Sequence, residues 1–402
     1  MTSEWNHFAL GEITELVIDY RGKTPKKLGG DWCKQGYRAL SAKNIKTGRI
    51  VQAETIRYID ESLYRKWMKD EVQRGDILIT SEAPFGQIFF WDSDEKIVLS
   101  QRLFCVRIKP EYDARFIYYY MTTPEFQSEL DGRATGTTVI GLRQPELMKC
   151  VIRCPEIQEQ KVIAAILSSM DAKIIANEKV NDNLYAQARA IKRQWVAKSK
   201  DRYELLPLNE VAAINPDTYS PKEAWEYVNY LDTSSITNGF IADIQHIVPS
   251  SEKLPSRARR KVAAGDVLFS TVRPNQNHFG IISDPLPNML ASTGFAAIRS
   301  KNPLVCNELI YLCLTELDFI EKMQQLAEQS TSTFPSIKPS DLGTCQIPCP
   351  KDESSDAFTD TLKSLFALIA ENFRENSSLA TMREALLPKL MSGEIDVSAV
   401  QL

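Results

Sequence analysis

The chain has 402 residues, 43% hydrophobic and 25% charged, which is enough for two or more packed domains without a large disordered part. Its formal net charge of −4 gives no sign of nucleic-acid binding, but local basic patches matter more for such binding than the total charge. No run of about 18 apolar residues predicts a membrane span, and the start lacks a signal-peptide pattern. Eight cysteines without export predict reduced thiols in the cytoplasm.

An internal repeat runs along the chain. Its clearest pairs are residues 37–45 with 228–236, 72–81 with 262–271, and 116–121 with 309–314. The first pair reads as a strand followed by a polar loop, and the second as a Gly-Asp turn before a β-branched strand. The third pair precedes a short helical stretch in each copy. Strands and short helices mix without a βαβ rhythm, which predicts an α+β fold for each copy.

Cationic and amide side chains gather in the polar loops of both copies. In the first copy the candidates are Arg21, Lys23, Lys26, Lys43, Asn44, Arg133, Thr137 and Thr138. In the second copy they are Arg259, Arg260, Arg273, Asn275, Gln276, Asn277, Ser332 and Thr333. Lys and Arg neutralise phosphates, while Arg, Asn and Gln bind guanine and adenine edges. Polar loops are common in any protein, but their equivalent placement in both copies predicts binding of double-stranded DNA.

Cysteines also repeat, since Cys150 and Cys154 return 195 residues later as Cys345 and Cys349. A four-thiolate zinc site is one interpretation. The preferred interpretation is packing, because residues four apart in a strand share one face and Cys behaves as a small buried residue. We therefore expect no metal here.

Apolar residues alternate every four and three positions from Ile163 to Trp195, and the same spacing returns 195 residues later from Phe358 to Leu390. This row of residues, called the seam, predicts two long helices that pair as a coiled coil. The expected chain order is domain 1–155, helix 156–200, domain 201–350, and helix with tail 351–402.

Four asparagines stand at the centre of the two seams, namely Asn177, Asn181, Asn372 and Asn376. Asn at a core position is tolerated where it determines register. An antiparallel pair of helices would place Asn177 near Asn376 and Asn181 near Asn372. A parallel pair would also align them, so the asparagines alone leave the direction open.

Catalytic motifs are missing from the sequence. It has no Gly-x-Gly-x-x-Gly, no Walker A loop and no complete adenine-methyltransferase tetrad, and Asn215-Pro216-Asp217 is only a fragment. The three histidines are scattered without a partner motif. A self-sufficient DNA methyltransferase or nuclease is therefore the weaker alternative. A coiled-coil scaffold without DNA binding is another, but it leaves the cationic loops unexplained.

Three segments resemble the specificity subunit of a type I restriction-modification system. Residues 154–171 are similar to the family's Pro-x-x-x-Glu-Gln-x-x-Ile-Ala helix opening, residues 386–395 to its usual C-terminal ending, and residues 20–25 to a loop of its first recognition domain. The second helix departs from the pattern, because residues 351–356 replace the Glu-Gln opening.

The resemblance implies an α+β fold with two pseudo-symmetric target-recognition domains separated by an antiparallel two-helix coiled coil. Each domain would read one half of a bipartite DNA target, and the helix pair would set the unread gap and dock two methylation subunits. Restriction subunits would join through the methylation subunits. The chain itself would be non-catalytic, and S-adenosylmethionine, ATP and Mg would bind to the partners.

Overall fold

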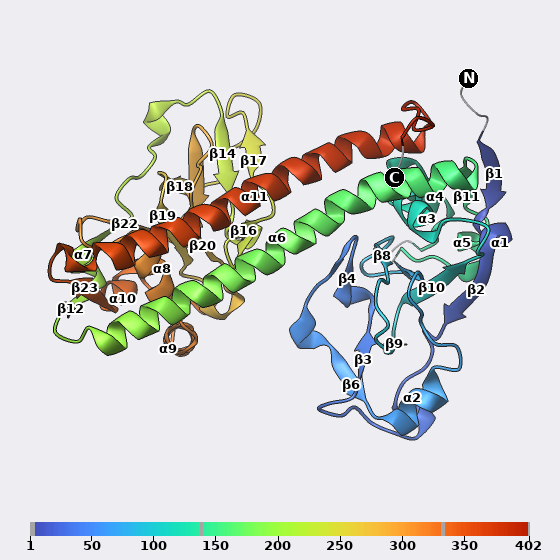
Figure 1. Cartoon of the computed structure of the whole chain (residues 1–402), viewed down its shortest axis with the longest axis horizontal. Coiled ribbons are helices and arrows are strands. Elements are labelled where there is room, and N and C mark those ends of the chain that lie inside the picture. Colours follow the sequence, from blue (N-terminus) through green and yellow to red (C-terminus); the bar gives the residue numbers. More distant parts are fainter. Residues whose placement is uncertain (1–4, 137–139, 331–333, 401–402) are drawn as a thin grey trace. The chain divides into compact units, whose positions relative to one another are not determined.

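A computed structural model describes residues 5–136, 140–330 and 334–400 (Figure 1). The chain forms two compact units: unit 1 holds Met1–Ile174 and Ser378–Leu402, and unit 2 holds Ile175–Ser377. Both borders fall inside long helices, so each unit contains a segment of each helix. Over the described residues, no helix is long and apolar enough to cross a membrane.

Unit 1 is built on an antiparallel sheet with strand order β2–β10–β7–β8. These strands are Thr14–Asp19, Leu103–Ile108, Ile77–Thr80 and Ile88–Phe90. A second sheet, β6–β3–β9, comprises Arg57–Ile59, Tyr37–Leu40 and Ile97–Leu99. Two further pairs are β1–β11 (Asn6–Ala9 with Val151–Cys154) and β4–β5 (Ile45–Lys46 with Arg49–Ile50). The short helices are α1 (Leu10–Ile13), α2 (Glu61–Trp67), α3 (Ala114–Met121), α4 (Pro124–Arg133) and α5 (Gln144–Leu147).

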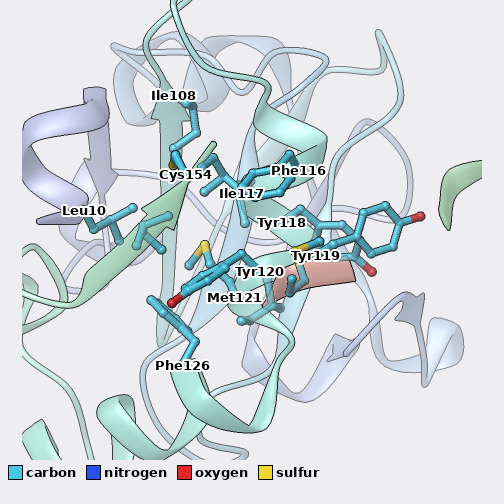
Figure 2. Packing of buried hydrophobic residues seen from close by; sticks show 14 of the residues in the cluster. Leu10, Ile108, Phe116, Ile117, Tyr118, Tyr119, Tyr120, Met121, Phe126 and Cys154 are labelled. Atoms are coloured by element: carbon cyan, nitrogen blue, oxygen red, sulfur yellow. The ribbon is translucent and has the colours of Figure 1, made fainter. Parts of the chain in front are cut away.

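Both faces of the main sheet of unit 1 are buried. Ile77 and Ile79 of β7 pack in one apolar cluster, whereas Leu78 between them packs in another, as period-two alternation requires. The first cluster surrounds α3, whose residues Phe116–Met121 are all buried (Figure 2). Burial on both faces explains why Ile77, Leu78 and Ile79 are all apolar, without the alternation of a half-exposed strand.

Unit 2 repeats this plan. Its main sheet, β13–β22–β19–β20, comprises Ala212–Ile214, Phe295–Ser300, Asp266–Ser270 and Phe279–Ile282. Its second sheet, β17–β14–β21–β18, comprises Gln245–Ile247, Val228–Leu231, Met289–Ser292 and Ala258–Lys261. The pairs are β12–β23 (Tyr203–Pro207 with Gln346–Pro350) and β15–β16 (Ile236–Thr237 with Phe240–Ile241). The helices are α7 (Leu208–Val211), α8 (Asn307–Leu314), α9 (Leu317–Glu328) and α10 (Pro339–Gly343). The α+β prediction and the internal repeat are therefore confirmed.

The repeated Gly-Asp turn anchors each main sheet. Asp76 is 1% exposed and accepts two hydrogen bonds of 2.9 Å from the guanidinium of Arg107 on β10. Asp266 is 0% exposed and accepts bonds of 2.7 and 2.9 Å from Arg299 on β22. The turn was foreseen from the sequence, but its arginine partners were not. A buried carboxylate needs such a partner, so each pair holds the turn against its neighbouring strand.

The long helices are α6 (Ile157–Lys198) and α11 (Asp356–Met391), which run in opposite directions (Figure 1). In unit 2, Asn177 Nδ2 donates to Asn376 Oδ1 at 2.9 Å, and Asn372 Nδ2 donates to Asn181 Oδ1 at 2.7 Å. Because the partner numbers fall on one helix as they rise on the other, the pair is antiparallel. The predicted asparagine contacts are confirmed.

The repeated cysteines lie at the β1–β11 and β12–β23 pairs. Cys150, Cys154 and Cys349 are buried, and Cys345 is half-buried. Burial raises the pKa of Cys150 and of Cys154 to about 12. A thiol held neutral in apolar surroundings acts as a small packing group, in agreement with the preferred interpretation.

Candidate nucleic-acid interface

Several loops of unit 1 meet at one end of its main sheet, where β2 and β7 end and β8 and β10 begin. Three backbone hydrogen bonds tie them together. Ser81 N donates to Arg102 O at 2.9 Å, Leu142 N to Ser81 O at 3.0 Å, and Gly48 N to Ile88 O at 3.1 Å. We call residues 20–23, 42–48, 81–87, 100–102 and 140–143 loop edge 1.

Unit 2 makes the same three bonds at equivalent positions. Thr271 N donates to Gly294 O at 2.8 Å, Ile337 N to Thr271 O at 2.9 Å, and Gly239 N to Phe279 O at 2.8 Å. We call residues 237–239, 271–278, 293–294 and 334–338 loop edge 2. Each unit thus presents a cluster of loops on one repeated backbone frame, and the side chains on that frame differ between the units.

The predicted cations of unit 1 differ in their partners and in whether they lie at loop edge 1. Arg21 lies in loop edge 1, where Asp19 accepts bonds of 2.8 Å from both Nε and Nη2 and the Phe104 ring lies 4.0 Å from the guanidinium. Lys23 Nζ donates to a backbone carbonyl of α2 and lies 3.6 Å from the Tyr20 ring centroid, and burial lowers its pKa.

Lys43 is exposed and lies in loop edge 1, where the neighbouring Ala42 N donates to Gln101 O at 3.1 Å. Lys26 is also exposed, but its short helical turn packs against α2 rather than at the loop edge. Lys43 therefore remains a candidate of this surface, and Lys26 is not brought to it.

Asn44 requires a correction. It is 1% exposed, its Oδ1 accepts from Ser41, and its Nδ2 donates to Gln52 O at 3.2 Å and to Thr55 Oγ1 at 3.0 Å. Each polar atom of this side chain is thus used within unit 1. The prediction that Asn44 contacts DNA is wrong, and its side chain instead supports the loop that carries Lys43.

Arg133 is the last residue of α4. It forms one ion pair with Glu129 at 2.8 Å and a second with Glu146 at 3.8 Å. Two carboxylates therefore already neutralise it. The predicted contacts Thr137, Thr138, Ser332 and Thr333 lie outside the described residues.

Arg273, Asn275, Gln276 and Asn277 share one loop of loop edge 2. Arg273 has a φ of 47° and its N donates to Pro335 O at 2.9 Å, while its guanidinium lies 4.9 Å from the Phe334 ring centroid. Asn275 and Gln276 are exposed, and Asn238 N donates to Asn277 O at 2.9 Å. The structure therefore brings this predicted set together on an accessible surface.

Arg259 and Arg260 belong to strand β18 rather than to a loop. Arg259 donates to Tyr219 O at 3.4 Å and to Ser256 O at 3.3 Å. Arg260 Nε is buried with no hydrogen-bond partner among the described residues, and burial lowers the pKa of Arg260. Both are half-buried, as Arg273 and Asn277 are, whereas Asn275 and Gln276 are exposed.

Two charged residues of loop edge 1 were missed in the sequence. Arg102 Nε lies 2.9 Å from Glu82 Oε1, and the pair lines a hollow of about 610 Å³ with Asp19, Arg21, Gly22 and Gln101. Both belong to polar stretches between strands, and neither stretch contains a recognisable motif or a cluster of cations. A signal was available only in their position, because Glu82 lies two residues after the end of β7 and Arg102 lies directly before the start of β10, at the same edge.

The N-terminal part of the chain matches a known family. Residues 2–185 match the family model described as "Type I restriction modification DNA specificity domain". These residues belong to that family. The resemblance to specificity subunits that was drawn from three short segments is therefore confirmed.

Named relatives agree. The "Type I restriction enzyme HindI specificity subunit" of Haemophilus influenzae is 24% identical over 163 residues, which are 40% of this chain and 35% of the relative. The "Type I restriction enzyme MjaIX specificity subunit" of Methanocaldococcus jannaschii is 25% identical over 350 residues, which are 81% of this chain and 78% of the relative. The chain thus spans about a third of the HindI subunit and most of the MjaIX subunit.

A solved structure shares the fold. The crystal structure of a type I restriction-modification system S subunit from M. genitalium is 18% identical, covers 96% of both chains and has a TM-score of 0.55. This similarity supports the specificity-subunit fold over almost the whole chain.

Proposed function

We propose that this specificity-family chain is the DNA-recognition subunit of a type I restriction-modification complex. Unit 1 reads one half of a bipartite double-stranded target through loop edge 1, and unit 2 reads the other half through loop edge 2. The observation that carries the proposal is the backbone frame repeated in both units with different side chains on it. Two similar frames suit two similar DNA grooves, and different side chains suit two different sequences.

In this proposal the helix pair sets the unread gap between the half-sites. Its support is the asparagine register, which resists sliding of α6 along α11. The same helices expose apolar side chains, including Ile175 at 50%, Val180 at 46% and Leu368 at 54%. We assign such surface to two methylation subunits, because exposed apolar residues on one helix pair suit a protein partner. Restriction subunits join through them, and S-adenosylmethionine, ATP and Mg act in these partners.

Co-expression with its methylation subunit tests the proposal. The complex should methylate adenines of the host genome only within a split target, and it should bind duplex DNA with an affinity that falls as salt rises. The purified chain with S-adenosylmethionine alone should modify nothing. Modification or cleavage by the chain alone would favour the enzyme alternative, and a complex without DNA binding would favour the scaffold alternative.

A further inference from the structure

We propose that Arg102 and Glu82 together read one G·C base pair in the half-site of unit 1. This inference rests on the proposed function, and it concerns residues that no sequence motif singled out. The two side chains come from different loops of loop edge 1, one beside the end of β7 and the other beside the start of β10.

The backbone holds both residues firmly while leaving their side chains accessible. Ser81, directly before Glu82, donates its N–H to Arg102 O at 2.9 Å, so the two loops are tied at the base of the pair. Above this bond the side chains of Arg102 and Glu82 are 47% and 35% exposed. They line the polar hollow of about 610 Å³ at the loop edge. This arrangement provides fixed positions with groups that face outward.

The contact between the two side chains is easily exchanged. Arg102 meets Glu82 through Nε alone, and its guanidinium has no other polar partner in the described part of unit 1. Arg21 in the same hollow differs, because it holds Asp19 through two bonds and stacks on Phe104. An exposed pair of this kind adds little to stability, so its two charged ends are free to bind a ligand at small cost.

Unit 2 shows that the frame does not need this pair. Its equivalent bond joins Thr271 to Gly294, so Val272 stands at the position of Glu82 and Gly294 at that of Arg102. A Cβ on Gly294 would lie 2.5 Å from Thr233 Oγ1, which leaves no room for a side chain. The charged pair is therefore particular to unit 1, as a residue that selects a sequence should be.

Backbone conformation adds a second argument. Arg102 has a φ of 66°, a left-handed conformation that glycine adopts without strain and that is unfavourable for residues with a Cβ. The position thus carries a large charged side chain where the backbone favours none. Such a residue is expected where the side chain itself has a use.

The chemistry of the pair matches G·C. A guanidinium donates to guanine O6 and N7 in the major groove, and a carboxylate accepts from the N4 amino group of cytosine. Because the two bases of one pair present these groups side by side, an adjacent Arg and Glu can bind both. An A·T pair offers an adenine amino group and a thymine methyl group, which this combination does not match as well.

The test uses the full chain with its methylation subunit and a DNA library randomised over the half-sites. For Arg102→Gln we expect preference for guanine at one position to fall about 5- to 150-fold, the equivalent of ~1–3 kcal/mol. Glu82→Gln keeps the side-chain shape and should relax the same base pair. The half-site of unit 2 should be unchanged by both substitutions.

Arg74→Gln is the matched control, since Arg74 is an exposed arginine paired with Asp92 and Asp94 beyond the opposite end of β7. It should leave both half-sites unchanged. A wild-type complex without a split target would mean that the proposed function fails. A normal wild-type target, with Arg102→Gln and Glu82→Gln leaving it unchanged or weakening all positions equally, would overturn this inference alone. Melting curves ensure that only folded variants are compared, and Glu82→Gln decides if Arg102→Gln fails to fold.

Discussion

Arg383 of α11 forms an ion pair with Asp171 of α6 in unit 1, and Tyr119 of α3 donates a hydrogen bond of 2.5 Å to the same carboxylate. Burial and then the charge of Asp171 raise the pKa of Tyr119, so its hydroxyl stays a donor. This polar trio interrupts the apolar seam. In unit 2, Ala188 stands at the position of Arg383, and Phe366 stands at the position of Asp171. Phe366 packs against Tyr185 and Tyr311.

Replacing Arg383 alone should therefore destabilise unit 1. Among the described residues, Arg383→Met leaves the half-buried Asp171 with the Tyr119 hydroxyl as its one partner, at an expected cost of about 1–3 kcal/mol in the free energy of unfolding. Asp171→Leu with Arg383→Met and Tyr119→Phe should recover most of it. Thermal and denaturant unfolding measure both. The control Arg65→Met removes the exposed pair with Glu61 and should leave the melting temperature nearly unchanged. An equal loss in both single variants would contradict this role.

Replacing one asparagine of a central pair should destabilise the protein more than replacing both. Asn372→Leu leaves Asn181, which is 3% exposed, without the donor to its Oδ1, at an expected cost of about 1–3 kcal/mol. Asn181 Nδ2 already lacks a partner among the described residues. The double variant Asn181→Leu with Asn372→Leu should therefore be as stable as wild type or more so. Denaturant unfolding compares the three, and a double variant weaker than the single would refute this account.

Lengthening the helix pair should lengthen the gap in the target. Seven residues inserted after Ile174 and seven after Ser377 keep the 4-3 spacing and add roughly 10 Å at 1.5 Å per residue. That length corresponds to about three base pairs at ~3.4 Å each. Methylation profiling should show both half-sites preserved around a longer gap. An altered half-site with an unchanged gap would sink the spacer role.

Arg273→Ala should relax one base position in the half-site of unit 2 only. Loss of one bidentate base contact reduces discrimination by roughly 1–3 kcal/mol. Phe334→Leu removes the ring beside the guanidinium and should weaken the same position less strongly, because Arg273 is still present but less well oriented. Binding to a randomised library measures both. If Arg273→Ala weakens all sequences alike, this residue contacts a phosphate instead.

Alkaline pH should lower the free energy of unfolding of unit 2 through the ionisation of Tyr185. Burial raises the pKa of Tyr185 from 10.0 to about 12, so the folded chain keeps a proton that the unfolded chain loses between these values. This contribution is complete below pH 10 and is lost as the pH rises toward 12. Tyr185→Phe should make the free energy of unfolding fall less steeply over that window. Denaturant unfolding at several pH values checks it, and identical slopes would show that Tyr185 contributes nothing.

Sequence patterns were enough to predict the repeat, the two long helices and the place of the four asparagines at the centre of their seams. These features depend on local periodicity and turn residues, which lie close together along the chain. The Gly75-Asp76 turn and its copy at Gly265-Asp266 were read in the same way. Three short segments were also enough to indicate the family.

The asparagines alone left the direction of the helices open, because parallel and antiparallel pairs both align them. The resemblance implied an antiparallel pair, and the contacts of Asn177 with Asn376 and of Asn372 with Asn181 in the tertiary structure confirm it. Only the tertiary structure decided which loop residues face outward. The sequence predicted Asn44 as a DNA contact, but its side chain is buried. Arg102 was not among the predicted contacts, yet it lines an open hollow. The difference arises because loop edge 1 is assembled from residues far apart in sequence, Ser81 with Arg102 and Leu142. Exposure at such an edge depends on which strands pair, and no short stretch of sequence carries that information.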